Sequence, residues 1–145
     1  MLLAALALGA AVEPAVAADW WLVGADSRSA MFVDRASLAR EGARVTQRVA
    51  AVMPHLPVRR VEVVERLDCT AGTATDLEIV YHLANGAVVR RAPGNAPRSP
   101  KPNSVGRATF DFACGTEAAR GRLGAPIGSD ALEEVAELAV RGGNL

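Results

Sequence analysis

The chain has 145 residues, half of them hydrophobic, which suffices for one domain with a modest core and is too short for two independent domains. Its 16 basic residues balance its 16 acidic residues. A nucleic-acid-binding protein usually carries a strongly basic face, so we expect no nucleic-acid partner.

Residues 1–18 have the pattern of a signal peptide. An apolar run, Leu2–Val12, is followed by Glu13-Pro14 and then by the small residues Ala15–Ala18. Cleavage after Ala17 or Ala18 would start the mature chain near Asp19 and place it in the periplasm or at the cell surface. No Lys or Arg stands between Met1 and the apolar run, although a signal peptide normally begins with a positively charged segment. The alternatives are a cytosolic protein or an uncleaved anchor, but an anchor needs about 18 uninterrupted apolar residues. We therefore expect no membrane span after cleavage.

Alternating and β-rich segments predict a mostly antiparallel sheet. Leu77, Ile79, Tyr81 and Leu83 alternate strictly, which predicts a buried face, and Asn85-Gly86 predicts a type I′ hairpin turn. Residues 35–42 end on a turn glycine and predict a single helical turn or a loop. The predicted strands are 19–24, 29–34, 44–52, 61–67, 75–83 and 88–91.

The second half of the chain predicts helices. Four prolines make 92–103 the longest loop, and Ser104 then has the character of an N-cap for a short helix over 105–113, with a seventh strand as the alternative. Residues 115–128 predict a linker. Asp130 and Glu133 approximate a capping box that opens a C-terminal helix, either docked or loosely attached.

These elements predict an α+β fold, with an antiparallel β-sheet of about six strands and one or two short helices packed on it. The domain covers 19–115, and 116–145 form a linker and the C-terminal helix.

Cys69 and Cys114 are the two cysteines, and in an exported chain they predict one disulfide. Closing a loop of about 45 residues would stabilise the fold by roughly 4 kcal/mol in the chain-entropy model. A zinc site that adds His55 and His82 is the alternative, but the close spacing of known zinc motifs is missing.

Several short pieces in one order resemble the surface-adhesin protein E family of small exported bacterial proteins. They are 19–24, 31–38 with Gly42, 67–69, 102–106 and 112–114, so the resemblance covers about residues 19–115. It implies an antiparallel sheet with a packed helix, a Cys69–Cys114 disulfide and adhesion through host extracellular-matrix proteins.

Little in the chain predicts catalysis. Only His55 and His82 could serve as a histidine base, and no G-x-S-x-G motif is present. Phosphate-cradling glycine motifs are absent as well, so we expect no cofactor, no metal and no enzyme. A deep pocket that held His82 beside a carboxylate would reopen the question of an enzyme.

Basic side chains provide the candidate binding surface. Four to six such charges on one side of the domain could hold a sulfated polysaccharide or an acidic protein patch, whereas solvated strand ends are the alternative interpretation. Trp20 and Trp21 are adjacent, so in a strand one ring faces the core and the other faces the opposite side. The C-terminal helix could cover the outer ring; if it does not, the exposed indole is a candidate anchor for a binding partner, and Trp21 is the candidate residue. The candidate ligand-binding residues are Arg59, Arg60, Arg90, Arg91, Arg98, Lys101 and Trp21.

The sequence thus predicts a non-enzymatic binding domain for an extracellular-matrix protein or a sulfated polysaccharide, with a second copy of the chain as a further partner. The alternative is a periplasmic structural or accessory protein that contacts its partner through Trp20 or the C-terminal helix.

Overall fold

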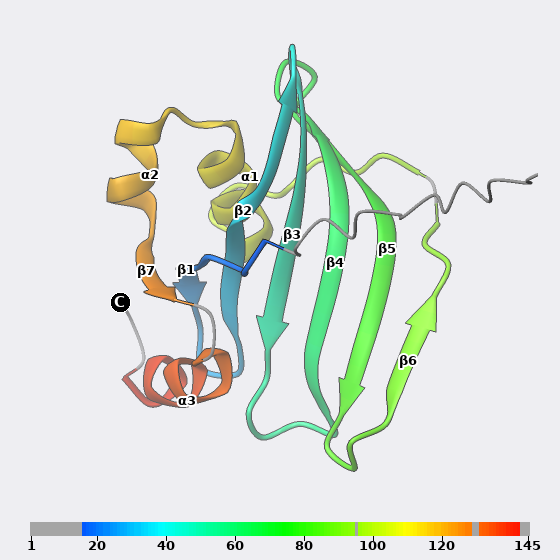
Figure 1. Ribbon diagram of the computed structural model, residues 1–145, viewed down its shortest axis with the longest axis vertical. Coiled ribbons are helices and arrows are strands. Elements are labelled where there is room, and N and C mark those ends of the chain that lie inside the picture. The colour runs from blue at the N-terminus through cyan, green and yellow to red at the C-terminus, as the bar shows by residue number, and fades with distance from the viewer. Residues whose placement is uncertain (1–15, 95, 129–130, 143–145) are drawn as a thin grey trace, which may run out of the picture.

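The computed structural model describes residues 16–94, 96–128 and 131–142. The apolar run of the predicted signal peptide lies outside these residues, and so does Asp130 of the predicted capping box. Within them, seven strands form one open antiparallel sheet in the order β6-β5-β4-β3-β2-β1-β7, accompanied by three helices (Figure 1). The predicted α+β fold class is confirmed.

The element bounds are β1 Trp20–Ala25, β2 Ala30–Glu41, β3 Arg44–Val52, β4 Val58–Asp68, β5 Thr73–Leu83, β6 Val88–Arg91, α1 Val105–Cys114, α2 Glu117–Leu123, β7 Ala125–Gly128 and α3 Leu132–Gly142. Among the described helices, none combines the length and apolar character needed to cross a bilayer.

Strand β2 runs on through the segment that the sequence predicted to be a helical turn or loop. Its pairing with β3 shifts register between Asp34 and Ala39, so a bulge interrupts the ladder there. Two short side chains satisfy the backbone groups that the bulge releases. The Asp34 carboxylate accepts the Ala36 N–H at 3.1 Å, and the Ser37 hydroxyl oxygen accepts the Arg48 N–H at 2.8 Å. The bulge therefore lets one strand continue where local sequence indicates a break.

The predicted buried face of β5 is wrong. A register shift opposite Val64 and Glu65 leaves Leu77 unpaired, and this leucine is 42% exposed. Beyond the shift, Ile79 and Tyr81 are only half-buried. The bulge breaks the alternation on which the prediction relied.

The β5–β6 hairpin is confirmed, but its turn is not type I′. Gly86 has a φ of 85°, whereas Asn85 is not among the residues with positive φ. Asn85 instead accepts the Ala87 N–H through its side-chain oxygen at 3.0 Å. The asparagine therefore stabilises the turn by a hydrogen bond rather than by a left-handed backbone.

Helix α1 forms as predicted. The Ser104 hydroxyl oxygen caps it by accepting the Arg107 N–H at 3.2 Å. The predicted linker is wrong, since 117–123 form α2 and 125–128 form β7, which pairs with β1. Arg35 on β2 holds α2 by donating a hydrogen bond to Glu117, and this bond lowers the pKa of the Glu117 carboxyl and raises the pKa of Arg35.

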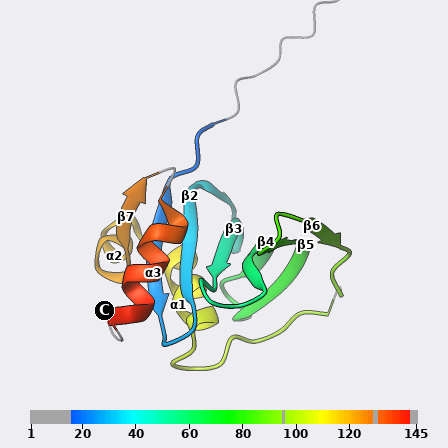
Figure 2. The same ribbon diagram turned by 90° about the horizontal axis from the view of Figure 1, so that it is seen from below.

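Two cores lie on opposite faces of the sheet, and we call these faces the α1 side and the α3 side (Figure 2). On the α1 side, Phe110 and Phe112 pack against Val45, Val49 and Leu67 in two adjoining clusters. On the α3 side, Leu132, Ala136 and Ala139 pack on the sheet, so the C-terminal helix is docked.

The predicted disulfide is present, with Sγ of Cys69 and Sγ of Cys114 2.02 Å apart. It fastens the C-terminus of α1 to the turn between β4 and β5. Because both sulfur atoms are joined in the disulfide, neither is a thiolate that could bind zinc, which excludes the alternative zinc site.

Candidate functional site

Helix α3 covers only one half of its side of the sheet. It packs on β1, β2 and β3, whereas β4, β5 and β6 have no helix over them on this side (Figures 1 and 2). We call this uncovered part, together with the adjoining Arg44 and Arg48 of β3, the open face. Strand register and pocket lining assign to it Arg44, Arg48, Arg60, Glu62, Val64, Arg66, Asp68, Thr73, Thr75, Glu78, Val80, His82, Val88 and Arg90.

One end of the open face contains a hollow of about 240 Å³, which we call the mixed-charge hollow. Arg60 Nε lies 3.0 Å from Glu62 Oε1, and Arg90 forms an ion pair with Glu78. Val64, Val80 and Val88 also line the hollow, and the register places Val80 between Glu62 and Arg90. The hollow thus combines paired cations and anions with apolar side chains.

His82 also lines this hollow, with Nε2 3.3 Å from Glu62 Oε1. A histidine beside a carboxylate is the arrangement that would favour an enzyme. However, the lining residues include no hydroxyl, thiol or lysine amine that the imidazole could activate as a nucleophile. Arg60 forms ion pairs both with Glu62 and with Glu133 on α3, the latter at 2.8 Å. The Glu62 carboxylate beside His82 therefore belongs to an ion-pair network that joins the sheet to the helix.

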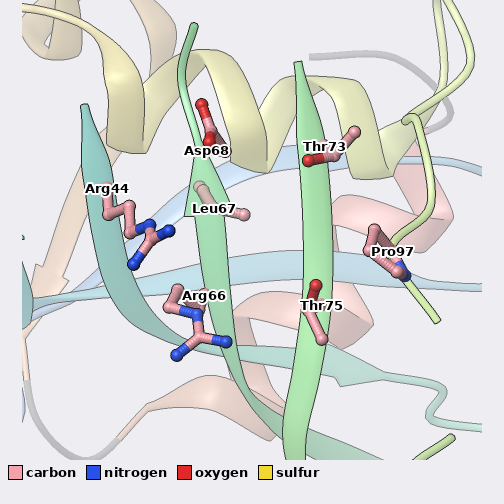
Figure 3. Close-up of a pocket in the computed structure, with 7 residues that line it drawn as sticks. All are labelled: Arg44, Arg66, Leu67, Asp68, Thr73, Thr75 and Pro97. Atoms are coloured by element: carbon pink, nitrogen blue, oxygen red, sulfur yellow. The ribbon is translucent and has the colours of Figure 1, made fainter. Parts of the chain in front are cut away.

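The opposite end of the open face contains a second hollow, of about 170 Å³, which we call the arginine pocket (Figure 3). Arg44 on β3 and Arg66 on β4 project over it, and Thr73 and Thr75 on β5 complete the row across the sheet. Sequence reasoning missed this pocket. Alternation places Arg44 on a solvated face, but only the β3–β4 register, which pairs Thr46 with Arg66, brings the two arginines together.

The predicted basic residues do not form one surface. Arg60 and Arg90 lie on the open face, and alternation turns Arg91 to the other side. Arg59 is the unpaired residue at a register shift between β4 and β5. Arg91 lies over the Tyr81 ring at 5.6 Å, with Tyr81 on the α1 side.

The remaining two, Arg98 and Lys101, line a hollow of about 320 Å³ beside Phe110 on the α1 side. Arg98 binds Glu65 at 2.8 Å and Asp76 at 3.0 Å. The prediction that these charges share one side is therefore wrong, and carboxylates neutralise Arg60, Arg90 and Arg98.

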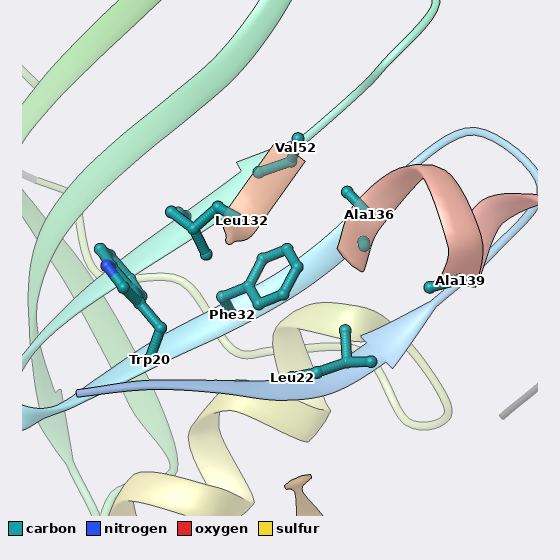
Figure 4. Close-up of a cluster of buried hydrophobic side chains, with 9 residues drawn as sticks. Trp20, Leu22, Phe32, Val52, Leu132, Ala136 and Ala139 are labelled. Carbon is teal, nitrogen blue, oxygen red and sulfur yellow. The ribbon is translucent and has the colours of Figure 1, made fainter. Parts of the chain in front are cut away.

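The two tryptophans occupy opposite sides of the sheet. Trp20 is 4% exposed and packs in the cluster that contains Phe32 and Leu132 of α3 (Figure 4). Trp21 faces α1, with its ring centroid 5.6 Å from that of Phe112 and its indole N–H donated to Asp19. Both rings have neighbours within the domain, so Trp20 offers no surface to an external partner and Trp21 offers only part of one.

In the part of the chain that the structure describes, no group of three or more His, Cys, Asp or Glu side chains is arranged to hold a metal ion. Comparison with known proteins gives no matching protein family, curated protein or solved structure. The resemblance to surface-adhesin protein E therefore stays a prediction.

Proposed function

We propose that the chain is an exported, non-enzymatic binding domain that holds a protein partner on its open face, through the mixed-charge hollow. The observation that carries this proposal is the combination of paired charges and valines over β4, β5 and β6 without a covering helix. Complementary charges in a defined order give an interface its register and exclude wrong partners, while apolar area between them contributes affinity.

The pairing of charges decides between the two predicted partners at this site. A sulfated polysaccharide binds to an excess of positive charge, but Glu62 and Glu78 neutralise Arg60 and Arg90 here. A protein surface can present both signs in the complementary order. An extracellular-matrix protein is therefore the partner we propose for the hollow, in accordance with the family resemblance and with the disulfide, which suits an oxidising compartment.

A charge swap tests the proposal. In the double variant Glu78→Arg/Arg90→Glu the ion pair within the chain is kept, but the order of charges offered to a partner is reversed. We expect binding to immobilised matrix proteins to weaken about tenfold, equivalent to roughly 1.4 kcal/mol, with an unchanged midpoint of urea unfolding.

The matched control is Arg28→Ala, in the exposed turn between β1 and β2, which should bind as the wild type does. A wild-type chain that binds none of the matrix proteins would refute the proposed function. A double variant that binds with wild-type affinity would show that the hollow is not the site.

A further inference from the structure

The arginine pocket contains two guanidinium groups that no carboxylate neutralises. The other three arginines of the open face each bind an acid: Arg48 binds Asp34, Arg60 binds Glu62 and Arg90 binds Glu78. Within the described residues, neither Arg44 nor Arg66 makes an ion pair or a side-chain hydrogen bond. Both side chains are exposed, and Figure 3 shows both over the same hollow.

The nearby acids have other roles or orientations. Asp68 pairs with Arg44 across the ladder, but its Oδ1 accepts the Thr70 N–H at 3.1 Å and the Ala71 N–H at 2.8 Å. It thereby holds the β4–β5 turn. Glu41, across the hairpin from Arg44, is exposed and forms no ion pair with it in the described structure. The guanidinium groups are thus available to bind an anion, while the two nearby carboxylates limit the net positive charge of the arginine pocket.

We propose that the arginine pocket binds a sulfate ester of a carbohydrate. Arg44 and Arg66 come from different strands, so their forks approach from two directions and suit the oxygens of a tetrahedral group better than a planar carboxylate. The hydroxyls of Thr73 and Thr75 add donors beside them. The volume of about 170 Å³ admits one such group rather than a larger ligand.

Charge and polarity favour a sulfated sugar over a phosphate monoester. A sulfate ester carries a single negative charge, whereas a phosphate monoester carries about −1.5 to −2 at neutral pH and would be repelled more strongly by Asp68 and Glu41. The Asp68 carboxylate is an acceptor at the rim, where sugar hydroxyls can donate to it. A phosphodiester headgroup of a lipid also carries one charge, so the experiment must separate these two sources.

The test is a titration of the full exported chain in about 0.15 M salt, monitored by amide and arginine side-chain NMR signals and by calorimetry. The probes are a heparin-derived sulfated hexasaccharide, the same hexasaccharide after chemical desulfation, and vesicles that contain phosphatidylglycerol. We expect only the sulfated probe to bind, with shifts centred on Thr73, Thr75 and the Arg44 and Arg66 side chains.

Arginine variants locate the site. Arg44→Ala and Arg66→Ala should each weaken binding about tenfold, because each loses a charge-assisted hydrogen bond worth roughly 1.5 kcal/mol or more. Arg66→Lys should recover only part of the loss, since lysine keeps the charge but not the fork. Arg91→Ala removes an exposed arginine on the other side of the sheet and should change affinity less than about twofold.

Three results would overturn this inference: equal binding of the sulfated and desulfated probes, vesicle binding without hexasaccharide binding, or wild-type affinity in the Arg44→Ala/Arg66→Ala double variant. All variants lie on the surface, and unchanged thermal unfolding would verify that they fold. The Glu78→Arg/Arg90→Glu chain should still bind the hexasaccharide at this pocket, so a failure here is distinguishable from a failure of the protein-binding proposal.

Discussion

At the scale of single residues, Asp34 is the side chain whose loss we expect to be costly. It is 3% exposed; its Oδ1 accepts the Asp19 N–H at 2.9 Å and the Ala36 N–H, and its Oδ2 accepts two hydrogen bonds from Arg48. Asp34→Ala would leave the Ala36 N–H at the β2 bulge and the Asp19 N–H without a partner. We expect a loss of about 2–4 kcal/mol in the free energy of unfolding, measured with urea at an unchanged m-value.

Asp26→Ala is the control for this prediction. Asp26 also accepts two backbone N–H groups, from Arg28 and Ser29, but it lies in an exposed turn where water can replace it. Its loss should cost less than about 1 kcal/mol. Equal losses in the two variants would mean that the bulge does not depend on Asp34.

At the scale of elements, the sequence was informative where local chemistry decides the structure. The Ser104 cap and the apolar spacing of α1 are local, so that helix could be predicted. Helix α2 buries no residue and therefore leaves no apolar stripe to recognise. Strand β7 is four residues long, contains Pro126 and is held by its pairing with β1, which is a tertiary contact. The arginine pocket was missed for a related reason, because it depends on the register of three strands.

The proline-rich loop between β6 and α1 yields the prediction at this scale. Arg98 pairs with Ala74 of β5 through two backbone hydrogen bonds of 2.8 Å, and its side chain reaches Glu65, whose carboxylate is buried and also accepts from Gln47 at 2.7 Å. Arg98→Ala would leave Glu65 without its cation. We expect it to cost about 1–3 kcal/mol, because hydrogen bonds to charged groups are worth roughly this much.

A double-mutant cycle separates this ion pair from other effects of the substitution. In a Glu65→Gln background the buried group is neutral, so Arg98→Ala should cost clearly less than it does in the wild type. Urea unfolding of the four chains measures the coupling. Additive losses would indicate that Arg98 stabilises the loop only through its backbone.

At the scale of the whole molecule, the disulfide joins two segments that are far apart in the sequence. Cys69 follows β4 directly beside Asp68 of the arginine pocket, and Cys114 ends α1, 45 residues later. The intervening chain includes β5, β6 and the loop that Arg98 holds. The bond therefore constrains the half of the molecule that carries both proposed binding sites.

Replacing both cysteines, as Cys69→Ser/Cys114→Ser, avoids a free thiol and tests this role. Opening this loop of 45 residues should lower the free energy of unfolding by roughly 4 kcal/mol, as measured by urea unfolding without reductant.

Hydrogen exchange of the backbone amides should quicken in α1 and at the β4–β5 turn. In α3, which packs on the opposite side of the sheet, it should quicken no more than the drop in global stability explains. A loss below about 1 kcal/mol, or equal quickening in α1 and α3, would contradict the role proposed for the bond. Binding of the sulfated hexasaccharide should weaken in the same variant, because Asp68 and Thr73 flank the turn that the disulfide holds.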